Sequence, residues 1–261
     1  MALLRGRFAI LKDRHAHEGQ RMRTIGLLGG MSWESSAVYY RRINETVRNR
    51  LGGLHSAAVI LHSVNFEAIV ALQKAGDWDQ AGEVLAQIAR NLEAAGADCV
   101  LICTNTMHKL ADTVQHAVSI PLLHITDVTG AAVTAANCQR PLLLATRYTM
   151  EQDFYVSRLR ETHGLDPMVP NEADRIAVHD IIFGELCCGI VRDASRQRYL
   201  DIIATAKAAG ADSVILGCTE IGLLIGAGDF DLPAFDSTLI HADAAVAFAL
   251  ELHDAQQLAA A

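Results

Sequence analysis

The sequence lacks the features that would place the protein in a membrane or on nucleic acid. No run approaches the roughly 18 apolar residues of a membrane-spanning helix, although 51% of the residues are hydrophobic. Acidic residues outnumber basic ones and leave a net charge of -8, whereas nucleic acids and anionic membranes attract basic surfaces. We therefore expect a small-molecule ligand, and neither a nucleic-acid nor a membrane partner.

Lysine is scarce, and the glycine-rich loop has the wrong spacing for a nucleotide. Lys207 lies in a helical pattern and Lys12 lies in an atypical N-terminal segment, so a Schiff base with pyridoxal phosphate is not expected. The segment from Gly26 to Gly30 reads G-x-x-G-G and not the G-x-G-x-x-G of dinucleotide sites. We therefore expect no organic cofactor.

The six cysteines do not follow the dense, regular spacing of a secreted disulfide scaffold. Cys187 and Cys188 are adjacent rather than arranged as C-x-x-C, and His108 and His124 lack the spacing of metal ligands. We expect no metal site. Reduced thiols also predict a cytoplasmic protein.

Residues 1–21 differ in character from the rest of the chain. Arg5, Arg7 and Lys12 interrupt their short apolar pieces, and no uninterrupted core of a signal peptide is visible. We interpret this segment as a disordered extension or an upstream start, with the body of the protein beginning at Met22.

From Thr24 onward, short apolar strands alternate with amphipathic helices. Ser32, with Ser35 three residues later, is typical of a helix N-cap. The patterns predict an α/β fold of two pseudo-symmetric lobes, each a parallel sheet flanked by helices. The first lobe comprises residues 22–125 and a returning helix in 238–261, and the second comprises 126–237. Strands are expected over 24–30, 57–64, 98–103, 119–125 and from 140, and helices over 32–50, 78–96 and 198–210.

An internal repeat sets the register of the two lobes. GADCVLICTNTMH, at 96–108, matches GADSVILGCTEIG, at 210–222, with an offset of 114 positions (210 minus 96). The alignment pairs Cys103 with Gly217 and Thr104 with Cys218. Because successive side chains of a strand point to opposite faces, Thr104 is predicted to face the site and Cys103 the core.

Both repeats end in polar residues, Thr104 to Thr106 and Cys218 to Glu220. Ligands bind at the carboxyl ends of parallel strands, so these residues are expected to share one cleft between the lobes. Two facing strand ends suit stereoinversion, in which one group removes a proton from a carbon beside a carboxylate and another returns a proton from the opposite side. A cysteine performs the first step only as a thiolate, from an ordinary pKa of about 8.5.

Several interpretations stay open from the residues alone. The repeat is also compatible with packing alone, and Cys103 with a small buried hydrophobe. Glu220 either orients Cys218 or interacts with a helix dipole. Met31 and Thr146, in the loops after the first strand of each half, either bind substrate or only form turns.

Seven segments together resemble the cofactor-independent aspartate/glutamate racemase family, closest to its broad-specificity amino-acid racemase subgroup. The resemblance spans residues 22–250. It implies an amino-acid substrate, an interlobe active site, no pyridoxal phosphate and commonly a homodimer. The segments are TIGLLGGMSWESSAVYY, GGLHSA, CTNTMHK, TRYTMEQDFY, ELCCG, GCTEIGLL, and LPAFD with the following IHADAAVAF.

Two positions depart from the family pattern. In most members the first catalytic cysteine directly precedes the Asn, but here Thr104 precedes Asn105 and Cys103 lies one residue earlier. The expected base is therefore Cys218, with Thr104 opposite and Cys103 as an alternative catalytic residue. Some members carry an arginine soon after the second strand, which this chain lacks. The expected substrate-binding residues are Met31, Gln73, Asn105, Thr106, Thr146, Thr219 and Glu220.

Two alternative functions also fit these residues. One is a related cysteine enzyme acting on other carboxylates, of the hydantoin racemase or maleate isomerase type. The other is a non-catalytic protein that closes on an amino acid. Exchange of the Cα hydrogen with deuterium oxide distinguishes a proton-abstracting enzyme from a binding protein.

Overall fold

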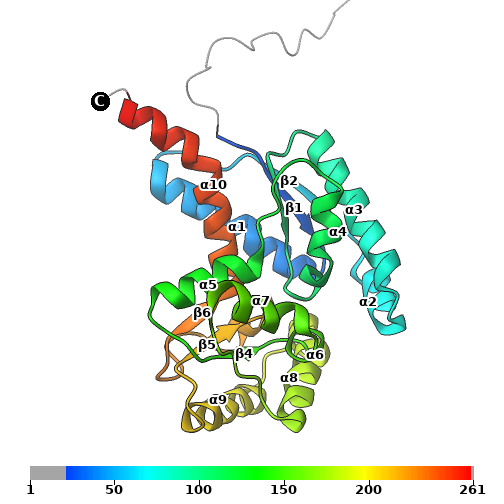
Figure 1. Ribbon diagram of the computed structural model, residues 1–261, viewed down its shortest axis with the longest axis vertical. Helices are drawn as coiled ribbons and strands as arrows, with labels where there is room; N and C mark the ends of the chain where they lie inside the picture. The colour runs from blue at the N-terminus through cyan, green and yellow to red at the C-terminus, as the bar shows by residue number, and fades with distance from the viewer. Residues whose placement is uncertain (1–21, 260–261) are drawn as a thin grey trace, which may run out of the picture.

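The computed structural model describes residues 22–259 and consists of two α/β lobes (Figure 1). The predicted extension at residues 1–21 lies outside the described residues. Each lobe contains a three-stranded parallel sheet, with strand orders β2-β1-β3 and β4-β5-β6. The predicted fold class is confirmed. The strands are β1 (Ile25–Gly29), β2 (Val59–Ser63), β3 (Cys99–Ile102), β4 (Pro141–Leu144), β5 (Ser213–Leu216) and β6 (Ala234–Asp236).

Helices connect the strands and cover the sheets. No helix among residues 22–259 is long and apolar enough to cross a bilayer. The α-helices are α1 (Trp33–Leu51), α2 (Phe66–Ala75), α3 (Trp78–Ala94), α4 (Ala111–His116), α5 (Ile125–Ala135), α6 (Arg147–Glu151), α7 (Asp153–His163), α8 (Glu172–Gly184), α9 (Asp193–Ala208) and α10 (Ser237–Ala259), and the 3₁₀ helices are η1 (Thr106–Leu110), η2 (Leu186–Cys188) and η3 (Thr219–Leu223).

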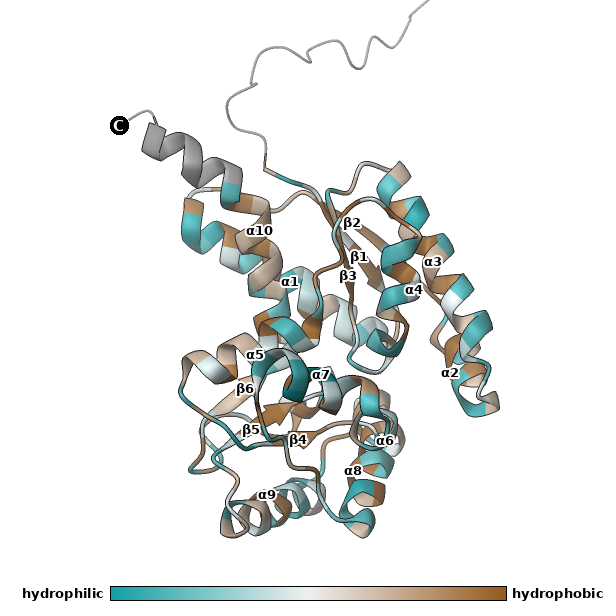
Figure 2. Cartoon of the chain, viewed as in Figure 1, coloured by the Kyte–Doolittle hydropathy of each residue, from teal (hydrophilic) through white to brown (hydrophobic). Residues whose placement is uncertain are grey.

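The first sheet is buried on both faces, which explains the apolar pattern of β1 and β3. One face packs against α2, α3 and α4 through Leu85 and Val114. The other face packs against α1 and α10 through Tyr39 and Val246. Figure 2 shows hydrophobic strands inside each lobe and hydrophilic positions on many helix surfaces.

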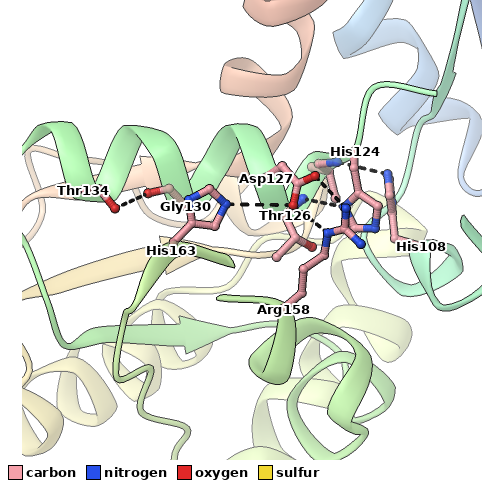
Figure 3. A network of polar contacts seen from close by, with 9 residues as sticks. His108, His124, Thr126, Asp127, Gly130, Thr134, Arg158 and His163 are labelled. Carbon is pink, nitrogen blue, oxygen red and sulfur yellow. Dashed lines mark hydrogen bonds and ion pairs between the residues drawn. The ribbon is translucent and has the colours of Figure 1, made fainter. Parts of the chain in front are cut away.

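The second lobe has its own apolar cluster, which includes Leu143, Ile215 and Tyr199. Within it, α7 packs against α5, and Arg158 donates two hydrogen bonds, of 2.5 and 2.7 Å, to the carboxylate of Asp127 (Figure 3). Ile125, the first residue of α5, belongs to this cluster. On this packing we propose that the chain crosses into the second lobe near residue 125 and returns at the start of α10.

The expected strand at 119–125 is wrong as a continuous element. Leu122 forms one isolated parallel bridge with Val100, and α5 begins at Ile125. The corresponding segment of the second lobe forms the short strand β6 instead. The first-lobe segment makes two backbone hydrogen bonds to Val100 before His124 caps α5.

Gly26→Ala should lower the free energy of unfolding by about 1 to 3 kcal/mol. A Cβ at Gly26 would lie 2.8 Å from the Cys99 carbonyl oxygen and 2.9 Å from Ala97 Cβ. Urea denaturation measures the loss. The matched control is Gly184→Ala at the end of α8, where a Cβ would meet no described atom within 4 Å, and where alanine favours the helix. Equal losses in both variants would contradict the close approach of β1 and β3.

Candidate active site

A cavity lies between the lobes at the carboxyl ends of β3 and β5. It contains about 20 Å³ of free space, room for about one water molecule. The structure places both expected catalytic residues, Cys218 and Thr104, in its wall. All seven expected substrate-binding residues line it as well, namely Met31, Gln73, Asn105, Thr106, Thr146, Thr219 and Glu220.

Cys218, Glu220 and Ser32 form a hydrogen-bonded chain across the cleft. The Cys218 thiol donates to Glu220 Oε2 over 3.0 Å. Ser32, which also caps α1, donates to Glu220 Oε1 over 2.6 Å. Glu220 and Ser32 are both buried. The carboxylate of the second lobe is therefore fixed by a hydroxyl of the first lobe and is ready to accept the thiol proton.

Burial raises the pKa of the Cys218 thiol well above its ordinary value, and the negative charge of Glu220 raises it further. A buried thiolate beside a carboxylate is unfavourable because neither charge is compensated. Both effects favour the protonated thiol. A positive charge brought by a ligand would offset Glu220 and lower this pKa.

A second cross-lobe contact repeats the geometry of the first. Thr106 Oγ1 and Thr146 Oγ1 are 2.9 Å apart, and Thr149 Oγ1 lies 3.2 Å from each. Thr146 precedes the helix that follows the first strand of its lobe, as Ser32 does, and Thr106 occupies the repeat position of Glu220. Each lobe thus contributes a strand-end residue that bonds a loop hydroxyl of the other.

The orientation of Asn105 follows from Ser237. The Ser237 hydroxyl donates to the Leu216 carbonyl over 2.9 Å, so its oxygen accepts from Asn105 Nδ2 over 3.0 Å. Asn105 Oδ1 is consequently turned away from Ser237, and it is buried without a partner in the described part of the chain. Since Asn105 lines the cavity, this oxygen is an available acceptor for a bound ammonium group.

Cys103 and Thr104 lie on opposite sides of the strand end. Cys103 is fully buried in the first-lobe cluster that contains Tyr39, and burial raises the pKa of its thiol. Behind Thr104, the His108 ring accepts from the Ile125 N–H and donates from Nδ1 to the Thr104 carbonyl over 2.8 Å. His108 thereby ties the end of β3 to the start of α5 (Figure 3).

The remaining wall consists of apolar residues that the sequence did not indicate. Phe66 lies at the start of α2, and Ile182 and Phe183 lie near the end of α8. Met107 and Cys187 complete this wall. Helices far apart in the chain supply these residues, so periodicity could not identify them. From the sequence, Ser32 was predicted only as a helix cap. It nevertheless lies in the loop after the first strand of its half, as Thr146 does, so the repeat could also have indicated Ser32 as a site residue.

A family profile described as Asp/Glu/Hydantoin racemase matches residues 28–245. The chain belongs to this racemase family. Racemase-family enzymes are isomerases. Among the described side chains, no group of three or more His, Cys, Asp or Glu is arranged to hold a metal ion.

Individual relatives of the racemase family cover most of the chain. A crystal structure of a Yersinia pestis protein assigned to the Asp/Glu racemases is 49% identical, covers 88% of this chain and 100% of its own, and has a TM-score of 0.83. An aspartate racemase homologue from Pyrococcus horikoshii OT3 is 33% identical, with 87% and 99% coverage and a TM-score of 0.77. The broad specificity amino-acid racemase RacX of Bacillus subtilis (strain 168) is 20% identical over 82% of this chain and 92% of its own.

Cys103→Ala should lower the free energy of unfolding by about 1 kcal/mol, because it removes a buried sulfur from the core. It should leave turnover unchanged. Urea denaturation and steady-state assays on the same preparation separate the two effects. Cys138→Ala, in the second-lobe core, is the matched control. Loss of turnover in a folded Cys103→Ala protein, with Thr104→Ala fully active, would assign the catalytic position to Cys103.

Proposed function

We propose that the protein is an amino-acid racemase that works without pyridoxal phosphate and inverts Cα across the interlobe cavity. The observation that carries the proposal is the Cys218–Glu220 pair facing Thr104 across one cavity in a chain of the racemase family. When a thiol is hydrogen-bonded to a carboxylate, its proton can pass to the carboxylate and leave a thiolate, which is a base. Deuterium exchange at Cα, measured for free amino acids, tests the function.

In the proposed reaction, Cys218 is the base and Glu220 takes its proton. The ammonium group of the substrate offsets the charge of Glu220, so the thiol proton passes to Oε2 and leaves a thiolate. The thiolate removes the Cα proton and becomes a thiol again, while Thr104 relays a proton from water to the opposite face of Cα. Glu220 returns its proton to water when the product leaves. Ser32 keeps the carboxylate oriented through the transfer.

Polar groups on both lobes hold the substrate backbone in this proposal. Asn105 Oδ1 accepts from the ammonium group, and the hydroxyls of Thr106 and Thr146 donate to the carboxylate. These donors stabilise the negative charge that develops on the carboxylate as Cα loses its proton. The cavity, with about 20 Å³, is smaller than an amino acid. We therefore propose that the lobes separate to admit the substrate and close around it.

Two further expectations remain proposals. The six cysteines are all free in the structure, which supports a reducing, cytoplasmic environment. A homodimer is proposed from the family resemblance.

Cys218→Ser should abolish racemisation of every substrate, because no other thiol in the cavity is hydrogen-bonded to a carboxylate among the described residues. Polarimetry and Cα deuterium exchange measure the loss. Cys188→Ser, at an exposed cysteine, is the control and should keep full activity. Substantial turnover by Cys218→Ser, in preparations free of metal and pyridoxal phosphate, would refute the mechanism.

Thr104 should make the two faces of Cα unequal. A hydroxyl is a poor base, so Thr104 can relay or supply a proton but not abstract one. A positioned base contributes about 10²- to 10⁴-fold. In deuterium oxide, one enantiomer should therefore exchange its Cα hydrogen with retention much faster than it inverts, while the other should not. At equilibrium the mixture is racemic in either case, because the two enantiomers have equal free energy.

The variant Thr104→Cys adds a second thiol and should raise exchange from the slow enantiomer. Proton NMR of each pure enantiomer in deuterium oxide gives both rates. Equal exchange of the two enantiomers by the unmodified protein would show that Thr104 does not limit either face.

A further inference from the structure

Part of the cavity wall is apolar. Phe66, Met107, Ile182 and Phe183 line it, and Gln73 provides an amide. Gln73 is buried, and its Nε2 donates to the thioether sulfur of Met107 over 3.0 Å. A thioether is a weak acceptor, so a ligand oxygen would replace this contact with a stronger hydrogen bond.

Of the described residues that line the cavity, Glu220 alone carries a formal charge. A substrate with a second carboxylate would therefore bury an additional negative charge without a cationic partner. Such burial is strongly unfavourable, since a buried charge is tolerated only when it is paired. A carboxamide or hydroxyl of the same shape meets no such penalty.

Three Lys or Arg residues lie within two positions of lining residues along the chain, and none of them lines the cavity. Lys74, next to Gln73, is exposed. Lys109 Nζ donates to Gln152 over 2.6 Å and lies 4.1 Å from the centre of the Trp78 ring. Arg147, next to Thr146, pairs with Glu151 over 3.0 Å.

His179 does not supply the missing charge either. Its ring stacks near Phe183, with centroids 4.8 Å apart, and its Nδ1 accepts from the Arg147 backbone N–H. Burial lowers the pKa of His179, so the ring is neutral at physiological pH.

On the proposed racemase function, we propose that the substrates are amino acids with uncharged side chains, and that Gln73 selects those ending in a hydroxyl or carboxamide. The Gln73 amide leaves Met107 and donates to the side-chain oxygen. The apolar wall packs against the intervening methylene groups, and neither step requires a cation.

Isosteric pairs test this inference on the unmodified protein. Asparagine should be racemised with kcat/KM at least about tenfold higher than aspartate, and glutamine at least about tenfold higher than glutamate, as expected when one member of each pair leaves a buried charge unpaired. Equal or higher values for the acidic members would overturn the inference while leaving the racemase function intact. Absence of Cα exchange with all four would instead refute the proposed function.

A variant that adds the missing cation provides a second test. Gln73→Arg should reverse the preference within each pair toward the acidic member. The matched control is Gln80→Arg at an exposed position of α3, which adds the same charge outside the cavity and should not change the ratios. If both variants shift the ratios equally, long-range charge and not the cavity sets the preference, and the inference is wrong.

Discussion

The two lobes depend on a single constraint, which is that polar side chains at the ends of buried strands need partners where water is excluded. Thr106 and Glu220 lie just past the ends of β3 and β5, and each forms a hydrogen bond with the opposite lobe. The partner is a hydroxyl in the loop after the first strand of that lobe, Ser32 for Glu220 and Thr146 for Thr106. The cleft is therefore held closed by hydrogen bonds that cross it in both directions. Those bonds also explain why the two loops and the two strand ends meet at the cavity.

The same symmetry makes the chemical difference between the lobes visible. At equivalent positions, the second lobe carries a thiol and a carboxylate, while the first carries two hydroxyls. The two lobes have the same backbone arrangement, so this chemical difference between them does not arise from the fold. It is confined to the side chains at Thr104 and Thr106 against Cys218 and Glu220. In the proposed mechanism, a proton can move from a thiol to a carboxylate only in the second lobe, so the two sides of the cavity are chemically unequal.

The sequence predicted what local periodicity and the repeat encode. The apolar patterns located β1, β3, β4 and β5, and the offset between the repeats placed Thr104, not Cys103, at the cavity. Tertiary context decided the remainder. The segment at 119–125 has the composition of a strand but forms only one isolated bridge.

The apolar wall was not predictable because helices from both lobes build it, and their cavity-facing residues do not differ in type from core residues. Ser237 was equally hidden. Its hydroxyl donates to a backbone carbonyl, and that contact alone determines how Asn105 is turned.

Closure and charge together determine what the cavity can accept. A hydrogen bond contributes about 0.5 to 1.5 kcal/mol net, so the few cross-lobe bonds can break at a modest free-energy cost when the lobes open. In the proposed reaction, closing excludes water from the cavity, and every charge inside must then be met by an opposite charge or by hydrogen-bond donors. Glu220 contributes one negative charge, and the ammonium group of an amino acid offsets it. The α-carboxylate adds another, which the threonine hydroxyls meet as hydrogen-bond donors. A further charge on the ligand would have no oppositely charged partner among the described residues that line the cavity. Closure therefore disfavours substrates with a charged side chain.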